Sequence, residues 1–318
     1  KTVPLWVPAE SEFVIEGWVS TESGGPGWNP DTEPDLGPGA VFEGPFGDHT
    51  GFYSLPDRYP IVNVTAVTHC SNPILPATVV GPPPQEDYCL GKATERIFKP
   101  LLKVIVPDIV DYNLPLFGCF HNAAIVSIKK EYSFQANKIM HAIWGAGQMA
   151  WTKIVIVVDD SVNVHNEDEV FKAIVTNCKW SMDLKRVMGP VDILDHAAPV
   201  LGGAGKLGID ATPSWKEELD IYQNELPDFR STTDEEINTY FDKKEEFKNV
   251  VVPSIGKGRV VLCTVPDELL DKRGIRLKKI VSNLPQGSDL LITAPEGTSM
   301  KESNKFLFEV VSNFDSYR

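Results

Sequence analysis

Positive charge is in short supply in this sequence. Its 318 residues include 30 lysines and arginines against 44 aspartates and glutamates, which gives a formal net charge of -14. Such a chain repels the phosphate backbone of nucleic acids, and no basic stripe offsets that repulsion. The composition therefore argues against a nucleic-acid partner and favours a soluble protein.

Long apolar runs are also missing. No run reaches the roughly 18 apolar residues that a transmembrane helix needs. The first residues, Lys1 to Pro4, lack the apolar core of a signal peptide. We therefore expect no transmembrane segment, and a cytoplasmic protein, with a peripheral position on the membrane as the alternative location.

Cysteine pairs are lacking as well. The five cysteines are odd in number and widely spaced, and no Cys-x-x-Cys pair offers a zinc or redox site. The histidines from His121 onward show no ligand spacing, and Asp159-Asp160 is interpreted as a strand-ending turn rather than a metal site. The sequence therefore predicts free, mostly buried thiols and no metal ligands.

Two carboxylates stand out in residues 42–53, which read Phe-Glu-Gly-Pro-Phe-Gly-Asp-His-Thr-Gly-Phe-Tyr. On a regular strand the five-residue spacing of Glu43 and Asp48 would send their side chains to opposite faces. The proline fixes one φ and the glycines permit unusual ones, so a loop can bring both acids to one point. Paired carboxylates suit general acid/base catalysis, although solvated turn residues are the commoner interpretation of such spacing.

The whole run from Glu43 to Tyr53 closely resembles the hallmark of the UbiD family, the aryl and acrylic acid decarboxylases that use prenylated FMN. The resemblance implies that Glu43 and Asp48 are the two acidic residues beside the reactive cofactor ring, with Asp48 as the acid/base. Aspartate followed by His-Thr-Gly is similar to the quinone-pathway members, which favours hydroxyaryl substrates. His49 either orients Asp48 or packs against Phe52.

A glycine-rich stretch, residues 201–208, is the second candidate site. Backbone amides of a glycine-rich bend together with Lys206 could hold a phosphate. It is not a Walker A loop, because Leu207 stands where serine or threonine must bind magnesium, and a plain turn is the simpler interpretation. The resemblance implies that Lys206 contacts the cofactor phosphate. It also places Leu90 near the family's apolar residue against the flavin, although a core leucine is the simpler interpretation.

The pattern of elements predicts an α/β protein in three parts. Residues 1–85 read as short strands and turns, part of a split β-barrel that the resemblance identifies as a remnant of the flavin-binding domain. Residues 86–230 begin with a connecting helix that Pro100 kinks or ends, and continue as an α/β C-terminal domain. Residues 231–318 read as a charged helix and a small βα tail.

Individual elements follow from apolar periodicity and caps. Asn166 is expected to cap a helix, with Glu169 completing a capping box, and Ser133 is expected to cap another. The expected strands are 61–68, 73–80, 109–114, 123–129, 154–158, 259–265 and 290–293, and the expected helices are 134–151, from 166, 234–248, 277–281 and 306–311. Residues 20–40 are expected to be loop.

The resemblance runs from about Val7 to Trp215 and implies several partners. They are prenylated FMN, a flavin prenyltransferase that supplies it, an aromatic carboxylic acid, further copies of the chain, a divalent metal (manganese or magnesium) and potassium. The family's N-terminal portion, with its catalytic arginine, its metal ligands and most of its flavin pocket, has no match here. We therefore expect a fragment, or one of two polypeptides.

Three functions remain open at this point. The first is a carboxy-lyase that decarboxylates an aromatic hydroxycarboxylate in menaquinone or ubiquinone biosynthesis, with Asp48 as acid/base. The second is a catalytically incompetent assembly module, which oligomerises through residues 93–230 and needs an N-terminal partner region for its cofactor. The third, a nucleotide-binding domain that uses the loop at 202–208, has the least support.

Overall fold

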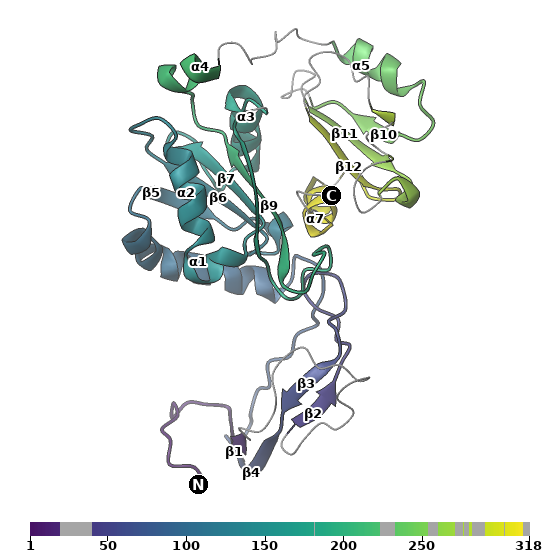
Figure 1. Ribbon diagram of the computed structural model, residues 1–318. Helices are drawn as coiled ribbons and strands as arrows, with labels where there is room; N and C mark the ends of the chain where they lie inside the picture. Colours follow the sequence, from purple (N-terminus) through teal and green to yellow (C-terminus); the bar gives the residue numbers. More distant parts are fainter. Residues whose placement is uncertain are drawn as a thin grey trace. The chain divides into compact units, whose positions relative to one another are not determined.

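The structure is a computed structural model, and it contains two compact units, Lys1–Gln85 and Glu86–Arg318 (Figure 1). The architecture is mixed α/β, as predicted. The predicted division into three parts, 1–85, 86–230 and 231–318, stays a prediction. The described residues are 1–19, 40–180, 182–222, 233–253, 260–270, 276, 280–281, 290–301 and 303–313. The loop predicted at 20–40, apart from Ala40, and most of the helix predicted at 277–281 lie outside them.

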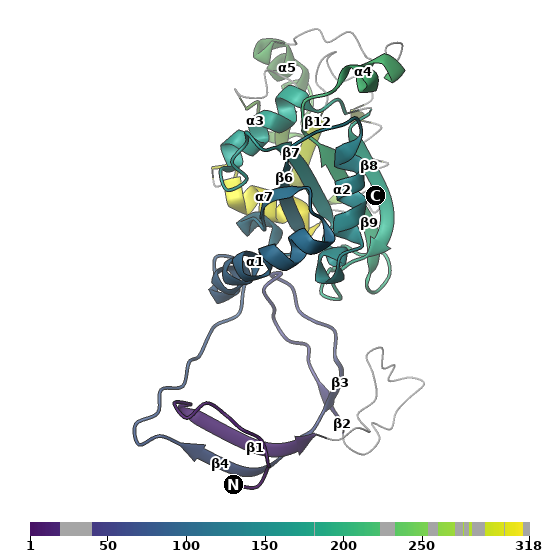
Figure 2. The same cartoon turned by 90° about the vertical axis from the view of Figure 1, so that its left-hand side faces the viewer.

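The first unit contains two antiparallel ladders, visible in Figure 2. Strand β1 (Phe13–Val19) pairs with β4 (Val62–His69), and β2 (Ala40–Glu43) pairs with β3 (Asp57–Pro60). The strand predicted at 61–68 is thus confirmed as β4. The split barrel stays a prediction.

The strand predicted at 73–80 is wrong, since those residues form no strand. Pro73 and Pro76 lack the N–H groups that a ladder needs.

The second unit is built on a five-stranded sheet in the order β5-β6-β7-β9-β8. Strands β6, β7 and β9 are parallel, and the two edge strands run antiparallel to their neighbours. Strand β6 is buried on both faces, and side chains alternate between two core clusters, one containing Val126 and Val157 and the other Ile125 and Ile156. The bounds are β5 (Ile109–Asn113), β6 (Ala123–Ile128), β7 (Ile154–Asp159), β8 (Leu184–Pro190) and β9 (Gly203–Asp210).

Three helices accompany this sheet, and they correct the predictions in part. Helix α1 (Glu86–Ile105) continues through Pro100 for five residues. Helix α2 (Gln135–Trp144) ends at Gly145, and a 3-10 turn (Gly147–Trp151) replaces the rest of the helix predicted at 134–151. Helix α3 (Glu167–Asn177) begins as predicted, because the Asn166 side chain accepts from the backbone N–H groups of Asp168 and Glu169.

The predicted N-cap of α2 is wrong. Phe134, not Ser133, occupies the cap position, in the left-handed region at φ 61° and without a side-chain cap. Its N–H instead donates to the Glu218 carboxylate at 2.6 Å, far away in sequence. A tertiary contact therefore satisfies a backbone N–H group at the start of the helix.

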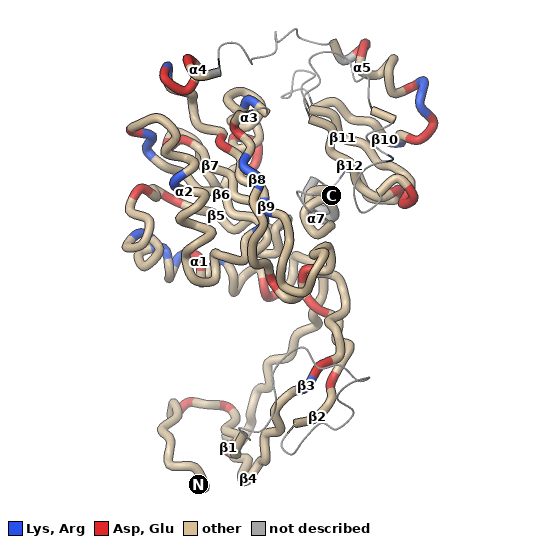
Figure 3. The backbone as a smooth tube through the Cα atoms, viewed as in Figure 1, with Lys and Arg blue, Asp and Glu red and all other residues tan. Residues whose placement is uncertain are grey.

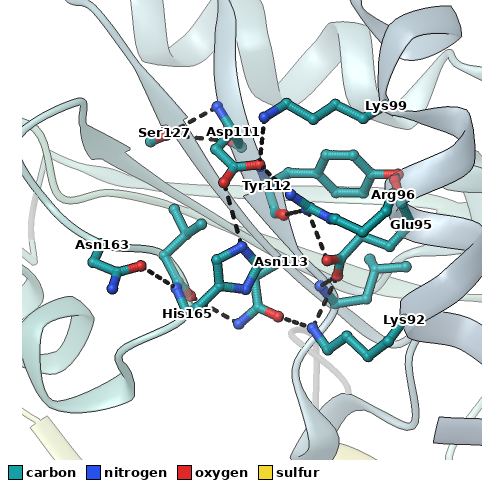
Figure 4. Close-up of polar contacts among 12 residues, drawn as sticks. Lys92, Glu95, Arg96, Lys99, Asp111, Tyr112, Asn113, Ser127, Asn163 and His165 are labelled. Carbon is teal, nitrogen blue, oxygen red and sulfur yellow. Dashed lines mark hydrogen bonds and ion pairs between the residues drawn. The ribbon is translucent and has the colours of Figure 1, made fainter. Parts of the chain in front are cut away.

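A polar network fastens α1 to the sheet (Figure 4). The Glu95 side chain, fully buried, pairs with Lys92 at 2.9 Å and Arg96 at 2.7 Å. Arg96 and Lys99 also pair with Asp111 on β5. Burial alone would raise the pKa of Asp111, but hydrogen bonds from Lys99 and Arg96 hold it well below its usual range. One face of α1 is thus anchored by charge.

The C-terminal part of the second unit adds a three-stranded sheet. The helix predicted at 234–248 ends at Phe241, while the strands predicted at 259–265 and 290–293 and the helix at 306–311 are confirmed. Acidic residues lie on α4 and beside α5 (Figure 3). The elements are α4 (Lys216–Tyr222), α5 (Asp234–Phe241), β10 (Lys248–Val251), β11 (Val260–Val265), β12 (Leu290–Pro295) and α7 (Ser303–Ser312).

Two smaller observations complete the fold. None of the five cysteines, all of which lie in the described ranges, forms a disulfide, and Cys119, Cys178 and Cys263 are buried, as predicted. Among the described residues, none of the helices is both long enough and apolar enough to cross a membrane.

Candidate functional site

The acidic run at 42–53 covers the end of β2 and most of the connection from β2 to β3. Beyond the paired strands, the two sides of the connection remain hydrogen-bonded to each other. The Ser54 N–H donates to the Phe46 carbonyl at 2.7 Å, and Gly47 and Tyr53 form an isolated antiparallel β-bridge. The Asp48 N–H then donates to the Phe52 carbonyl at 3.0 Å. The motif is therefore an extended hairpin with Asp48 at its tip.

The tip is a four-residue turn from Asp48 to Gly51. The Gly51 N–H donates to the Asp48 carbonyl at 3.0 Å, and aspartate in the first position and glycine in the fourth are typical of β-turns. Gly51 adopts φ +82°, in the left-handed region that glycine enters without steric cost. Thr50, inside the turn, is 3% exposed. Local sequence chemistry thus holds Asp48 in place.

Among the described residues, donors reach one of the two oxygens of the Asp48 carboxylate. Its Oδ1 atom accepts from the His49 N–H at 2.7 Å and lies 2.7 Å from the His49 Nδ1. Because a carboxylate accepts, Nδ1 is the protonated imidazole nitrogen in this contact. Within the described part of the chain, no hydrogen bond reaches Oδ2. Both side chains are partly exposed, Asp48 by 22% and His49 by 15%.

The second acid, Glu43, ends strand β2 directly opposite Asp57 on β3. Cross-strand partners project on the same face of a ladder, about 4.5–5.5 Å apart at Cβ, and like charges there destabilise the pairing. The Glu43 side chain is exposed and makes no hydrogen bond or ion pair with any described residue. Sequence reasoning missed Asp57, because only the strand register places it opposite Glu43.

The convergence of Glu43 and Asp48 on one point stays a prediction. The described residues also contain no group of three or more His, Cys, Asp or Glu side chains able to hold a metal ion. What the hairpin offers is two accessible carboxylates, one of them oriented by a histidine. That arrangement suits proton transfer to a bound molecule.

The glycine-rich stretch predicted as a bend is strand β9, paired on both sides with β7 and β8. Lys206 lies within it and is 1% exposed. Its ammonium donates to the Ala150 carbonyl, and burial lowers its pKa to about 8. A Cβ on Gly189 would lie 3.0 Å from Lys206 Cε, so this glycine makes room for the lysine stem.

Leu90 lies on α1 and is 62% exposed, so its interpretation as a core leucine is wrong. Ile97, Leu101 and Val104 are also exposed, at helical spacing from Leu90, while the opposite face carries the charged network. Leu90 and Lys206 belong to the second unit, and Glu43 and Asp48 to the first. Cofactor contact by Leu90 and Lys206 stays a prediction.

The second unit contains a small polar cavity that the sequence did not predict. Its volume is about 20 Å³, enough for one water molecule. Burial, and then the nearby Asp210, raise the pKa of Asp183 to about 6, and burial also raises the pKa of Asp210. The cavity is lined by Phe134, Asn137, Met182, Asp183, Asp210 and Glu218, residues far apart in sequence.

Comparison with family models gives two adjoining matches. Residues 1–83 match the Rift-related domain of UbiD, 3-octaprenyl-4-hydroxybenzoate carboxy-lyase, and residues 88–211 match the C-terminal domain of the same family. A relative from Archaeoglobus fulgidus, described as an uncharacterised protein, is 50% identical over 229 residues. That alignment covers 72% of this chain and 44% of the relative, so the chain spans less than half the relative's length.

Solved structures of two enzymes are also similar. The UbiD-class enzyme HmfF from Pelotomaculum thermopropionicum, in complex with FMN, is 29% identical with a TM-score of 0.55, over 68% of this chain and 44% of that one. Its evolved dimeric form, in complex with prFMN, is 28% identical with a TM-score of 0.50, over 67% and 42%. Vanillic acid decarboxylase from Sedimentibacter hydroxybenzoicus, in open form, is 28% identical with a TM-score of 0.57, over 66% and 42%.

Proposed function

Because the chain belongs to the UbiD family of carboxy-lyases, we propose that the complete protein decarboxylates an aromatic hydroxycarboxylic acid with prenylated FMN. The observation that carries the proposal is the hairpin tip, where Asp48 presents a partly exposed carboxylate that His49 holds through one of its two oxygens. The similarity to HmfF bound to prFMN and to vanillic acid decarboxylase supports the cofactor and the aromatic substrate.

The two acids of the hairpin have the exposure that contact with such a cofactor requires. Glu43 and Asp48 are accessible, and no described cation neutralises Glu43. When bound, the cofactor supplies the electron sink that an aryl ring lacks. Asp48 gives a proton to the ring carbon that loses CO₂ and afterwards recovers one from solvent, while Glu43 adds negative charge beside it.

Lys206 is the proposed contact to the phosphate of the cofactor. Lys206 fits a phosphate only after its ammonium leaves the Ala150 carbonyl, because the side chain is 1% exposed. We retain Lys206 and Leu90 as cofactor contacts and route no chemical step through them. The divalent metal and potassium that the family implies would have their ligands outside this chain.

Quinone biosynthesis is the proposed setting, with a hydroxybenzoate-type acid as substrate. The support is the Asp-His-Thr-Gly sequence at 48–51 and the family description, 3-octaprenyl-4-hydroxybenzoate carboxy-lyase. The proposed partners are a flavin prenyltransferase and further copies of the chain. The evolved dimeric form of HmfF is consistent with oligomerisation.

An assembly module is the alternative for this chain alone. It is favoured by the exposed apolar residues of α1 and by the chain's coverage of 44% of its relative. In that case the chain oligomerises and binds flavin only together with the rest of the protein. Light scattering of this chain distinguishes the two, since a monomer has no assembly role.

The experiment that tests the main proposal uses the complete protein, co-expressed with a flavin prenyltransferase. CO₂ release is measured on a panel of hydroxybenzoic acids, for the wild type and for Asp48→Asn. We expect the variant to lose turnover by at least about 100-fold while it keeps the flavin absorbance. Asp160→Asn, the same change at an exposed site after β7, serves as the control and retains turnover.

The outcome can contradict the proposal in two ways. If the wild type carries flavin but releases no CO₂ from any acid of the panel, the aromatic substrate class is wrong. If Asp48→Asn loses its flavin absorbance, Asp48 supports cofactor binding rather than proton transfer.

A further inference from the structure

The imidazole of His49 and the carboxylate of Asp48 form a contact at the hairpin tip that the reaction can use. We propose that His49 is the positioning residue for Asp48: it holds Oδ1, so that Oδ2 is the atom that delivers the proton. This inference rests on the proposed function. It names Oδ2 of Asp48 as the atom that carries the proton, and His49 as the residue that determines which oxygen this is.

The first step is the geometry of Oδ1. Two donors from one residue, the backbone N–H and the imidazole Nδ1 of His49, both lie 2.7 Å from this single oxygen. A carboxylate oxygen that already accepts two hydrogen bonds is a poor place for a proton. When Asp48 is protonated, the proton therefore resides on Oδ2, the oxygen that no described donor reaches.

The second step is the rigidity of the turn. The Asp48 backbone is fixed on both sides, because its N–H donates to Phe52 and its carbonyl accepts from Gly51, each at 3.0 Å. The Thr50 side chain is buried next to it. With the backbone fixed, the carboxylate still rotates about its side-chain torsions, and the His49 imidazole restricts this rotation together with the His49 backbone N–H. Orientation of this kind is worth up to about 100-fold in rate.

The third step is the proton balance. Over the whole reaction the carbon–carbon bond to the carboxylate breaks and CO₂ leaves, the O–H bond at Oδ2 breaks, and a C–H bond forms at the same ring carbon. Asp48 is left as a carboxylate, and both hydrogen bonds from His49 to Oδ1 stabilise that charge. A proton from solvent then restores Asp48, and no oxidant or reductant is consumed.

Two substitutions of His49 separate positioning from ring packing. His49→Asn keeps a side-chain N–H donor near the Nδ1 position but removes the ring, whereas His49→Phe keeps a ring and removes the donor. In the complete, cofactor-loaded protein we expect His49→Phe to lower kcat by about 100-fold with little change in KM. His49→Asn should remain within about 10-fold of the wild-type kcat. Flavin absorbance and the melting temperature check that both variants are folded and loaded.

The proposal is overturned if the two variants show the opposite order of kcat. An active His49→Phe variant and an inactive His49→Asn variant would assign His49 to ring packing. Two variants with wild-type kcat would remove any role for His49. If both variants lose flavin or fail to fold, the NMR measurement below decides.

A second readout is independent of turnover. In protein labelled with ¹⁵N histidine, the His49 signal should report a protonated Nδ1 in the wild type. It should lose that signature in Asp48→Ala, which lacks the acceptor. A His49 signal that is the same in both proteins overturns the contact. A confirmed contact in a protein that decarboxylates no aromatic acid would instead mean that the proposed function has failed.

Discussion

Lys153 and Asp195 form an ion pair of 2.8 Å in the interior of the second unit, with side chains 0% and 1% exposed. Lys153 precedes β7, and Asp195 lies between β8 and β9. The lysine ammonium also donates to the Val311 carbonyl in α7 at 3.3 Å. The pair therefore ties three parts of the unit together where solvent cannot replace either partner.

Removal of one member of this pair should destabilise the second unit strongly. Asp195→Ala leaves the Lys153 charge buried without its carboxylate, so the free energy of unfolding should fall by about 3–5 kcal/mol. Urea denaturation followed by far-UV circular dichroism measures it. The double variant Lys153→Met with Asp195→Leu should recover most of the loss, because apolar pairs replace buried ion pairs well. Equal losses in the single and double variants would contradict this account.

Glu43→Gln should separate activity from stability. The Glu43 side chain is exposed and makes no hydrogen bond or ion pair with a described residue, so the free energy of unfolding should change by less than about 0.5 kcal/mol. It should rise if it changes, because the charge opposite Asp57 is removed. Decarboxylation should fall by at least about 100-fold. A variant that keeps full turnover in the complete protein would remove Glu43 from the site.

Asp183 should make the stability of the second unit fall as the pH rises from about 4 to 6. Its folded-state pKa is raised from 3.8 to about 6 by burial and then by Asp210, so the native state holds the proton longer than the unfolded state does. The loss should amount to about 2–3 kcal/mol at most. Urea midpoints between pH 4 and 7 measure it. Asp183→Asn should flatten the curve, and an unchanged slope would exclude Asp183 as its source.

Lys206 should make the stability of the second unit rise, rather than fall, with increasing pH in the alkaline range. Its folded-state pKa is lowered from 10.5 to about 8 by burial, so between these values the unfolded state binds more protons. Stability should therefore rise with pH from about 8 to 10.5. Lys206→Met should remove that rise, as followed by urea midpoints in this pH range. If Lys206 contacts the cofactor phosphate, the variant of the complete protein should also lose flavin absorbance, and retained flavin would remove Lys206 from the site.

The sequence alone located most of the regular elements. The β-branched run at 154–158 and the apolar run at 123–129 became the buried parallel strands β7 and β6, because such runs suit strands that are covered on both faces. Asn166 capped α3 as expected, since a cap depends on atoms within three residues. The run from Glu43 to Tyr53 identified the family for the same reason, because its chemistry is contained in consecutive residues.

Predictions failed where distant residues outweighed local preference. Glycines 202, 203 and 205 favour a turn, yet hydrogen bonds from β7 on one side and β8 on the other hold residues 203–210 as strand. The Phe134 N–H at the start of α2 is satisfied by the Glu218 carboxylate, which lies far away in sequence. These outcomes depend on neighbours that no local window contains.

The sequence by itself thus determined the α/β class, the main buried strands and the location of the acidic motif, since periodicity and short-range chemistry control them. Only the tertiary structure decided that Asp57 faces Glu43, that Lys206 is buried against Ala150, and that Asp183, Asp210 and Glu218 share one cavity. Burial and pairing between separate strands set the environment of each charge. Both arise from contacts between residues that are far apart along the chain.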